Sequence, residues 1–286
     1  MNGIIIIDKP EGWTSQDVCA KLRGVFHEKR IGHGGTLDPM ATGVLPVFCG
    51  RATRAVEFCE NAEKSYTAGL RLGITTDTQD ITGTVLGEKS HDVTREKLCK
   101  ILPSFLGVQD QLPPMYSAVK IGGRKLYELA RKGIEAERKP RKINISRIEL
   151  LGEESGDFII DVTCSKGTYI RTLCSDIGDA LGCGGAMSSL RRTRAGAFTL
   201  DDAVPLDSVI NDDDPARFLK PVDSLFSAYP SVIIDGENMR RCLNGNDFPF
   251  DADDGKYRVY SSDGRFLMVG QCVSGKMSTV KSFFDV

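Results

Sequence analysis

Residues 32–46 restrict the backbone more than any other stretch of this chain. Glycine occupies positions 32, 34 and 35, and Asp38 directly precedes Pro39. Glycine permits backbone angles that other residues avoid, whereas a residue before proline is pushed into an extended conformation. The segment therefore predicts a tightly bent loop that holds the Asp38 carboxylate on a rigid turn. Taken alone, an Asp-Pro turn is more often structural than catalytic.

Hydrophobic patterning outside this loop predicts a mixture of strands and helices. The apolar run 4–7 indicates a buried strand, and the alternation over 158–164 indicates a strand with one apolar face. Residues 173–181 have helical spacing. The acidic, less periodic segment 201–228 predicts a linker. Short apolar runs between Gly and Asp turns after residue 229 predict a small β-barrel.

Composition excludes several classes of protein. Apolar residues make up 41% and charged residues 27%, and the net charge is −2, as in an ordinary globular chain. No apolar run approaches the ~20 residues that span a bilayer. The N-terminus lacks the basic start and long apolar stretch of a signal peptide, so we expect a cytoplasmic protein without membrane contact. Nine scattered cysteines and three histidines predict neither a disulfide framework nor a metal site.

Basic residues concentrate in residues 115–147. This segment holds ten basic and three acidic residues, a net charge of +7, which leaves −9 for the rest of the chain. Such a local excess is typical of a surface that binds nucleic-acid phosphates. On charge alone, a solvated surface helix balanced by acids elsewhere is equally compatible with the pattern.

Several motifs, in the order of a known family, extend the analysis beyond single residues. They are Gly3 to Thr14, Gly32 to Leu45 around Asp38, Lys64-Ser65-Tyr66 with Thr76-Asp77-Thr78, Ser165 to Leu173, and Leu190 to Phe198. Together they resemble the motifs of the TruB family of pseudouridine synthases, and they span roughly residues 3–200. A chance match of so many ordered motifs is very improbable.

The resemblance implies a fold and a reaction. It implies an α+β fold in residues 1–228, with a mixed, mainly antiparallel sheet, followed by a small PUA-like, RNA-binding β-barrel in residues 229–286. It implies isomerisation of uridine 55 in the T loop of tRNA, in which the N1–C1′ bond breaks and a C5–C1′ bond forms. Nothing is oxidised or added, so no cofactor and no metal are expected. We expect tRNA as the partner, no guide RNA, and a monomer.

The resemblance also implies the catalytic residues. Asp38 corresponds to the nucleophilic carboxylate, and Arg171 to the guanidinium beside it. A fixed guanidinium keeps a buried carboxylate charged and oriented. Tyr66 corresponds to a residue that stacks on uracil and takes part in removing the C5 proton. Without the motifs, a half-buried strand tyrosine and a surface arginine would be the default interpretations.

The remaining expected contacts are with substrate and RNA. Tyr169 and Leu190 correspond to residues that line the uracil pocket, with core packing as their alternative. His33 corresponds to a residue that contacts the T loop, from which the target base must be flipped. The basic segment corresponds to an RNA-clamping insertion. The expected RNA-binding residues are Lys9, Lys120, Arg124, Tyr127, Arg131, Lys132, Arg141 and Lys142.

Three other functions share parts of this pattern. A guide-RNA-dependent relative of the archaeal and eukaryotic branch would have the same aspartate motif. A non-catalytic RNA-binding or tRNA-folding factor would explain the basic segment, although not Asp38, Tyr66 and Arg171 together. A small-molecule glycosidase would require a second carboxylate as acid, and no motif for one stands out.

Overall fold

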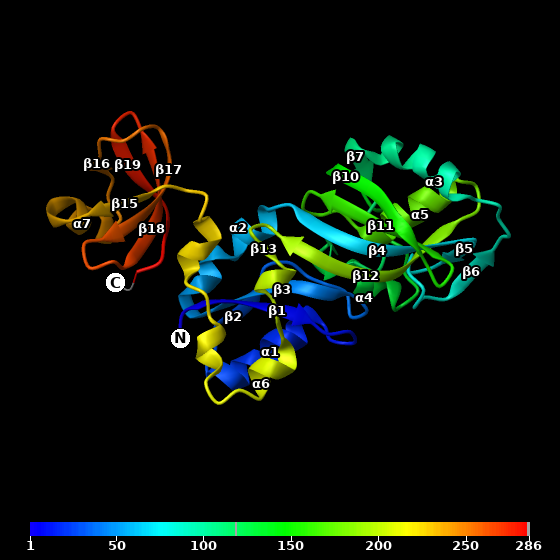
Figure 1. The fold of residues 1–286 in the computed structure, drawn as a ribbon, viewed down its shortest axis with the longest axis horizontal. Helices are drawn as coiled ribbons and strands as arrows, with labels where there is room; N and C mark the ends of the chain where they lie inside the picture. The colour runs from blue at the N-terminus through cyan, green and yellow to red at the C-terminus, as the bar shows by residue number, and fades with distance from the viewer. Residues whose placement is uncertain (118, 285–286) are drawn as a thin grey trace.

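Two β-sheets form the framework of the protein. The computed structural model describes residues 1–117 and 119–284, and of Lys120 the backbone alone. Figure 1 shows an elongated chain, with a large sheet and its helices towards one end and a smaller sheet at the other. Within the described residues, no helix is both long enough and apolar enough to cross a membrane.

The larger sheet has ten strands in the order β14-β1-β3-β12-β4-β11-β10-β7, with β2 paired to β3 and β13 paired to β12. Its strands are β1 (Gly3–Lys9), β2 (Ile31–His33), β3 (Thr42–Cys49), β4 (Lys64–Leu72), β7 (Gly107–Gln111), β10 (Arg141–Glu154), β11 (Asp157–Cys164), β12 (Gly185–Ala195), β13 (Phe198–Thr199) and β14 (Val204–Pro205). The β1–β14 and β3–β12 pairs are parallel, and the other pairs are antiparallel. The expected mixed, mainly antiparallel sheet is confirmed.

Helices and 3₁₀ turns bury three apolar regions of this sheet. They are α1 (Ser15–Phe26), α2 (Val56–Asn61), α3 (Arg95–Ile101), α5 (Ile170–Ala180) and α6 (Leu206–Ile210), with 3₁₀ turns η1 (Gly50–Ala55), η2 (Leu102–Phe105), η3 (Leu200–Asp202), η4 (Pro215–Phe218) and η5 (Val222–Phe226). Helices α1 and α6 pack on β1 and β3, whereas α3 and α5 pack on β4, β10 and β11. The two ends of the sheet therefore have separate cores.

The loop predicted for residues 32–46 is shorter than expected. Residues 42–46 belong to β3, and the loop is limited to residues 34–41, here called the Asp38 loop. Pro46 was the misleading signal, because proline lacks the N–H that a central strand needs. In β3, Pro46 lies between Gly43, which pairs with β12, and Val47, which pairs with β2. β3 stays paired with β1 here, but its other edge changes partner, so the missing N–H leaves no gap in the ladders with β12 and β2.

The prediction of a linker at residues 201–228 is wrong. This segment contains β14 and α6, and Ile4 of β1 exchanges backbone hydrogen bonds with Lys220 at 2.9 and 2.7 Å. Leu206 and Val209 are buried in the core beneath β1. Its apolar residues are too widely spaced to give a periodic signal, but they complete the edge of the large sheet.

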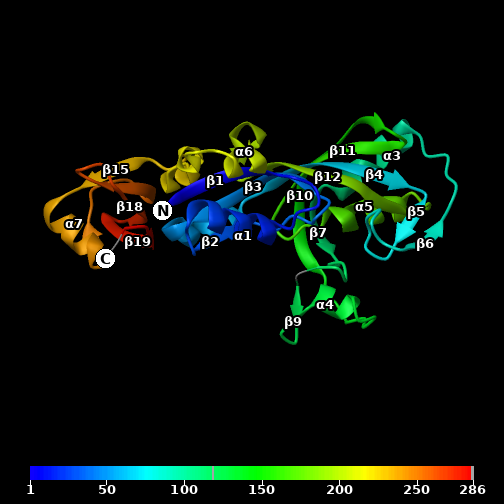
Figure 2. The same ribbon diagram turned by 90° about the horizontal axis from the view of Figure 1, so that it is seen from below.

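The basic segment 115–147 divides into two structural parts. Its middle forms β8 (Lys120–Ile121), β9 (Arg124–Lys125) and α4 (Leu126–Ala130). Figure 2 shows β9 and α4 extending away from both sheets, and residues 119–140 are here called the protrusion. The last basic residues, from Arg141 onward, lie instead in β10 of the large sheet. A separate hairpin of β5 (Ile74–Thr76) and β6 (Val85–Glu88) lies beside the large sheet.

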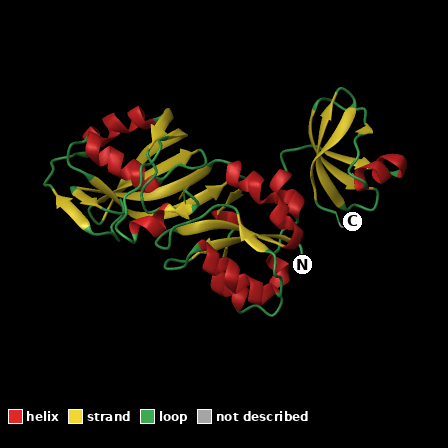
Figure 3. Cartoon of the chain, turned by 180° about the vertical axis from the view of Figure 1, so that it is seen from behind, coloured by secondary structure: helices red, strands yellow, loops and turns green. Residues whose placement is uncertain are grey.

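The smaller sheet has the order β15-β17-β18-β19-β16. Its elements are β15 (Ser231–Ile234), α7 (Gly236–Leu243), β16 (Phe248–Pro249), β17 (Gly255–Ser261), β18 (Phe266–Val273) and β19 (Lys276–Ser282). The sheet curls into a half-barrel with α7 at its outer end (Figure 3). Phe266 and Phe283 pack on Phe226, so an apolar cluster joins this sheet to the preceding segment. The domain boundary at residue 228 stays a prediction.

Candidate active site

Side chains from α1 and β1 hydrogen-bond to the backbone of the Asp38 loop and hold it in place. The hydroxyl of Ser15, the first residue of α1, accepts a hydrogen bond from the Leu37 N–H at 2.8 Å. The ammonium of Lys9, the last residue of β1, donates to the Pro39 carbonyl at 3.2 Å. These contacts hold the backbone on both sides of Asp38. The turn is therefore rigid, as its glycines and proline predict.

Arg171 faces Asp38 from the first turn of α5. Its Nε lies 3.0 Å from Oδ2 of Asp38, and its Nη1 lies 3.6 Å from Oδ2 of Asp80. The same guanidinium donates to the carbonyls of Thr78 at 3.1 Å and Tyr116 at 2.8 Å. Arg171 is only 6% exposed. It is therefore a buried guanidinium whose donors are directed at two carboxylates and two carbonyls.

The start of α5 sets the position of Arg171. Tyr169 is the N-cap residue of this helix. Its N–H donates to the side-chain oxygen of Gln111 at 2.8 Å, and its carbonyl accepts from the side-chain nitrogen of Gln111 at 3.0 Å. Sequence reasoning missed Gln111, because a glutamine at the end of a strand carries no distinctive pattern. Its amide binds β7 to the beginning of α5.

Asp80 is the second residue that sequence reasoning missed. It is 5% exposed, and its Oδ1 accepts from the Thr78 hydroxyl at 2.9 Å and from both the N–H and the hydroxyl of Thr82 at 3.0 and 2.5 Å. The hydroxyl-rich spacing of residues 78–82 was the available signal. Oδ1 of Asp80 is thus occupied by three hydrogen bonds and Oδ2 faces Arg171, so both oxygens of this carboxylate are engaged within the protein. Asp80 therefore does not supply the free acid that a glycosidase would require.

The side chain of Asp38 is partly buried and partly accessible to solvent. Its side chain remains 37% accessible, so a substrate can reach the carboxylate. Burial nevertheless raises the pKa of Asp38 above its ordinary value of 3.8, the nearby Asp80 adds to the rise, and the positive charges of Arg171 and Lys9 oppose it. The guanidinium is thus the main influence that keeps this carboxylate ionised.

Two of the expected substrate-binding residues lie in one apolar cluster with the Asp38 loop. Tyr66 of β4 and Leu190 of β12 are 9% and 8% exposed and belong to the same cluster as Leu37, with Met40 packed against it. Burial raises the pKa of Tyr66, so its phenol stays neutral. The structure therefore brings the side chains of residues distant in sequence to one side of the Asp38 turn.

His33 lies at the end of β2, directly before the Asp38 loop. Its ring is half-buried, and Nδ1 has no hydrogen-bond partner within the described part of the chain. Burial lowers the pKa of His33, with a smaller effect from Arg192. A neutral imidazole with an unpaired, buried nitrogen is a group that a ligand can satisfy.

The expected RNA-binding residues fall into three sets. Arg124, Arg131, Lys132, Arg141 and Lys142 are exposed, and Tyr127 is half-buried with Lys125 and Arg131 at 5.4 and 5.5 Å from its ring centre. The side chain of Lys120 lies outside the described residues. The expectation of an RNA contact at Lys9 is wrong, because Lys9 is fully buried and donates to the carbonyls of Pro10, Trp13 and Pro39.

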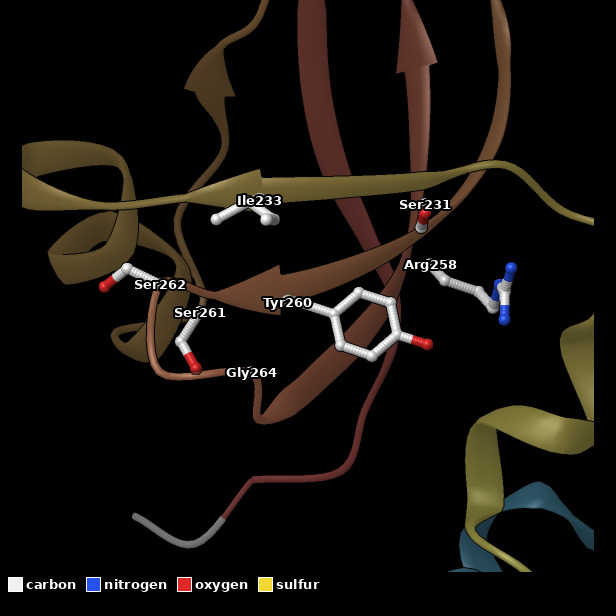
Figure 4. A pocket seen from close by; sticks show the side chains of 7 residues that line it. All are labelled: Ser231, Ile233, Arg258, Tyr260, Ser261, Ser262 and Gly264. Carbon is white, nitrogen blue, oxygen red and sulfur yellow. The ribbon is translucent and has the colours of Figure 1, made fainter.

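Two surface hollows are lined by residues other than Asp38. One, of about 280 Å³, lies on the smaller sheet and is lined by residues of β15, β17 and the following turn, including Arg258 and Tyr260 (Figure 4). Another, of about 250 Å³, lies beside β1 and includes the ion pair of Asp8 with Arg191. Within residues 1–117 and 119–284, no group of three or more His, Cys, Asp or Glu side chains could hold a metal ion.

Family models identify the class of protein that this fold and site define, a pseudouridylate synthase. The model described as "TruB family pseudouridylate synthase (N terminal domain)" matches residues 23–170. The model described as "tRNA pseudouridylate synthase B C-terminal domain" matches residues 171–227. The chain belongs to the TruB family.

Individual relatives agree with this assignment. The chain is 42% identical over 289 residues to a protein of Clostridium kluyveri named tRNA pseudouridine synthase B, covering 99% of this chain and 100% of the relative. It is 44% identical over 275 residues to a protein of the same name from Dechloromonas aromatica, with 95% and 91% covered. The fold also resembles a chain of a solved Cbf5-Nop10-Gar1 complex, with a TM-score of 0.75, 27% identity, and 99% and 85% covered.

Proposed function

We propose that the protein is a tRNA pseudouridine synthase that converts uridine 55 of the T loop to pseudouridine. One observation carries the proposal: the half-accessible carboxylate of Asp38 is paired with the buried guanidinium of Arg171 beside Tyr66. The relatives that match nearly the whole chain carry the name of this activity.

In this mechanism Asp38 is the nucleophile. Its carboxylate must be ionised to attack, and Arg171 opposes the rise in its pKa that burial causes. The N1–C1′ bond breaks, the uracil turns over, and a C5–C1′ bond forms. The proton lost from C5 is balanced by the proton gained at N1, so the atoms of substrate and product are the same and no cofactor is required.

Tyr66, Tyr169 and Leu190 hold the base during this rearrangement. The phenol of Tyr66 is kept neutral by burial, so it offers an aromatic face for stacking and an oxygen near the uracil for removal of the C5 proton. A base inside a folded loop cannot reach Asp38 unless it is flipped out. His33, at the edge of the Asp38 loop, supplies the group that contacts the T loop after flipping.

The exposed cations provide the RNA contacts. Arg124, Arg131 and Lys132 extend from the protrusion, and Arg141 and Lys142 extend from β10, so the two parts of the basic segment approach RNA from different elements. With this surface on its own chain, the protein acts as a monomer without a guide RNA, in the cytoplasm where tRNA is found. A guide-RNA-dependent enzyme would instead form no pseudouridine when the purified protein is incubated with tRNA alone.

The test is the purified protein with an unmodified tRNA transcript, in the presence of a metal chelator. Pseudouridine is measured at position 55 by base-selective chemistry and primer extension. A transcript with cytidine at position 55 and the Asp38→Asn variant are the matched controls. Formation of pseudouridine at position 55 by the wild-type protein alone supports the proposal. Binding of tRNA without turnover would instead identify a non-catalytic RNA-binding factor.

A further inference from the structure

Arg192 is a buried charge to which the proposed mechanism assigns no role. It lies in β12, is 1% exposed, and is among the largest fully buried side chains. Burying a guanidinium without a carboxylate is costly, and an apolar side chain of the same volume is often at least as stabilising. Its directional donors must therefore supply something that an apolar side chain cannot.

The donors of Arg192 reach both ends of the Asp38 loop. Its Nε donates to the carbonyl of Val44 at 2.7 Å, and its Nη2 donates to the carbonyl of Gly35 at 3.1 Å. Gly35 lies near the beginning of the loop, and Val44 lies just after its end. Because the guanidinium is planar and rigid, it fixes the distance between the two ends.

The glycines of this region make the contact possible. Gly43 has φ of +97°, and a Cβ at this position would lie 2.2 Å from the carbonyl oxygen of Arg192. Gly35 has φ of +123°, and a Cβ there would lie 3.5 Å from Nη1 of Arg192. A side chain at position 43 would clash with the backbone of Arg192, so only glycine allows β3 and β12 to lie this close.

The same residue is also the neighbour of Tyr66. Arg192 of β12 pairs with Tyr66 of β4, and its positive charge opposes the rise in the pKa of Tyr66 that burial causes. The loop that carries Asp38 and the strand that carries Tyr66 are therefore both positioned against one side chain.

Lys64 provides a comparison within the same core. It is 6% exposed and, like Arg192, donates to backbone carbonyls, at 3.0 Å to Cys59, 2.5 Å to Glu60 and 2.7 Å to Ala62. These carbonyls belong to the end of α2 and not to the Asp38 loop. Lys64 thus matches Arg192 in burial, charge and type of partner, but not in the segment that it holds.

We propose that Arg192 is a positioning residue for the isomerisation: it holds both ends of the Asp38 loop so that the carboxylate is correctly placed for attack. The inference rests on the proposed function. Misplacement of a reacting group by ~1 Å costs on the order of a hundredfold in rate. Arg192 lies beside Tyr66 and holds the backbone of the loop, so it acts through the groups that it positions.

The test compares Arg192→Met, Arg192→Lys and Lys64→Met with the wild type. Thermal unfolding and tRNA affinity are measured first. The single-turnover rate constant and amplitude are then measured separately at saturating enzyme. We expect Arg192→Met to keep its affinity and amplitude while its rate constant falls by about a hundredfold. Arg192→Lys keeps the charge but reaches fewer carbonyls, so its rate constant lies between the two. Lys64→Met should keep a rate constant well above that of Arg192→Met, because the hydrogen bonds that it loses go to the end of α2.

Misfolding and misplacement have different signatures in this experiment. A structural defect lowers the amplitude, because fewer molecules are active, whereas misplacement lowers the rate constant. A wild-type rate constant in Arg192→Met, a loss confined to amplitude or affinity, or an equal loss in Lys64→Met would overturn the proposal. If Arg192→Met does not fold, a wild-type rate constant in Arg192→Lys overturns it, and a loss of at least about tenfold supports it. Absence of turnover in the wild type would refute the proposed function instead.

Discussion

The Asp38 loop and the protrusion are built by opposite physical means. The loop is held by buried groups, each with a fixed partner, such as Lys9 on Pro39 and Arg171 on Asp38. The protrusion presents exposed cations, such as Arg131 and Lys132, to solvent. Interactions of the first kind depend on position and are not additive, whereas those of the second depend on salt and add up contact by contact. Variants of the two regions should therefore fail in different measurements.

The largest effect is expected from Asp38→Asn. The amide keeps the shape of the side chain but cannot be a carboxylate nucleophile, so we expect tRNA binding with no detectable pseudouridine. Primer extension after base-selective modification measures the product, and filter binding measures the affinity. Substantial turnover by this variant would show that Asp38 is not the nucleophile.

Arg171→Lys should have the next largest effect. A lysine keeps the charge but loses the planar donor arrangement that contacts Asp38, Asp80 and two carbonyls. We expect near-normal affinity and a single-turnover rate constant reduced by about a hundredfold. If Arg171→Lys loses only tRNA affinity, then Arg171 contacts RNA. In that case variants of the Asp38 site and of the protrusion would not differ in the measurement that they change.

The pH dependence of catalysis follows from the raised pKa of Asp38. Below that pKa the carboxylate is protonated, so the single-turnover rate should fall about tenfold per pH unit and should reach a plateau above it. Loss of the Arg171 charge should move this acidic limb to higher pH in Arg171→Ala, because burial then raises the pKa with less opposition. If the fall in rate at low pH occurs at the same pH in Arg171→Ala as in the wild type, a group other than Asp38 controls it.

The raised pKa of Asp38 also makes the stability of the fold depend on pH. As pH rises, this group lowers the unfolding free energy, whereas the catalytic rate increases. The folded protein binds a proton at Asp38 more readily than the unfolded chain, so this group's contribution to the unfolding free energy falls as pH rises from 3.8 through the raised pKa. Asp38→Asn should therefore unfold at the same or a higher temperature than the wild type at neutral pH, and the difference should vanish at low pH. A lower unfolding temperature at neutral pH would contradict this sign.

Removing exposed cations should have a smaller effect and should change the salt dependence. We expect Arg131→Ala with Lys132→Ala, and separately Arg141→Ala with Lys142→Ala, to weaken tRNA binding. Each lost phosphate contact should reduce the log-log salt slope by about one unit. The rate constant at saturating enzyme should remain that of the wild type. An unchanged slope in both double variants would show that the basic segment is only a solvated face.

The smallest effect is expected from the smaller sheet. Lys256 and Lys276 are exposed there, but acidic residues outnumber basic ones 15 to 9 over residues 201–286. Replacing both lysines by alanine should change tRNA affinity by no more than about threefold. A loss as large as that of the protrusion variants would show that this sheet is a main RNA-binding surface.

Local patterns predicted the elements better than they predicted the partners of those elements. The Thr-x-x-Asp sequence at residues 14–17, typical of a capping box, begins α1, with the Asp17 N–H 3.0 Å from the Thr14 hydroxyl. The alternation over 158–164 forms β11. Residues 201–228 gave no periodic signal, because short segments that pack on an existing sheet edge need few apolar residues. Helix α7 was missed for a related reason: it buries only Cys242.

The site residues that lie in a family motif could be predicted from the sequence. Asp38 and Arg171 were expected together, and the structure pairs them. Gln111 and Arg192 contribute through hydrogen bonds to groups far away in the sequence, and such contacts leave no local pattern. Asp80 has local hydroxyl partners, but its ion pair with Arg171 joins residues that are distant in the sequence. Lys9 was misassigned because a lysine beside a proline turn usually lies at the surface, and only the folded chain shows the three carbonyls that surround it.

The strand order also determines when the large sheet can close during synthesis. Strand β12 lies between β3 and β4, although it follows them by more than a hundred residues in the chain. Until the ribosome has released residue 195, the edge of β4 and the end of β3 that face β12 are unpaired, and unpaired edges are templates for aggregation. At the usual speed of translation this interval lasts on the order of ten seconds. We therefore expect the nascent chain to be most exposed to aggregation between the synthesis of β4 and that of β12.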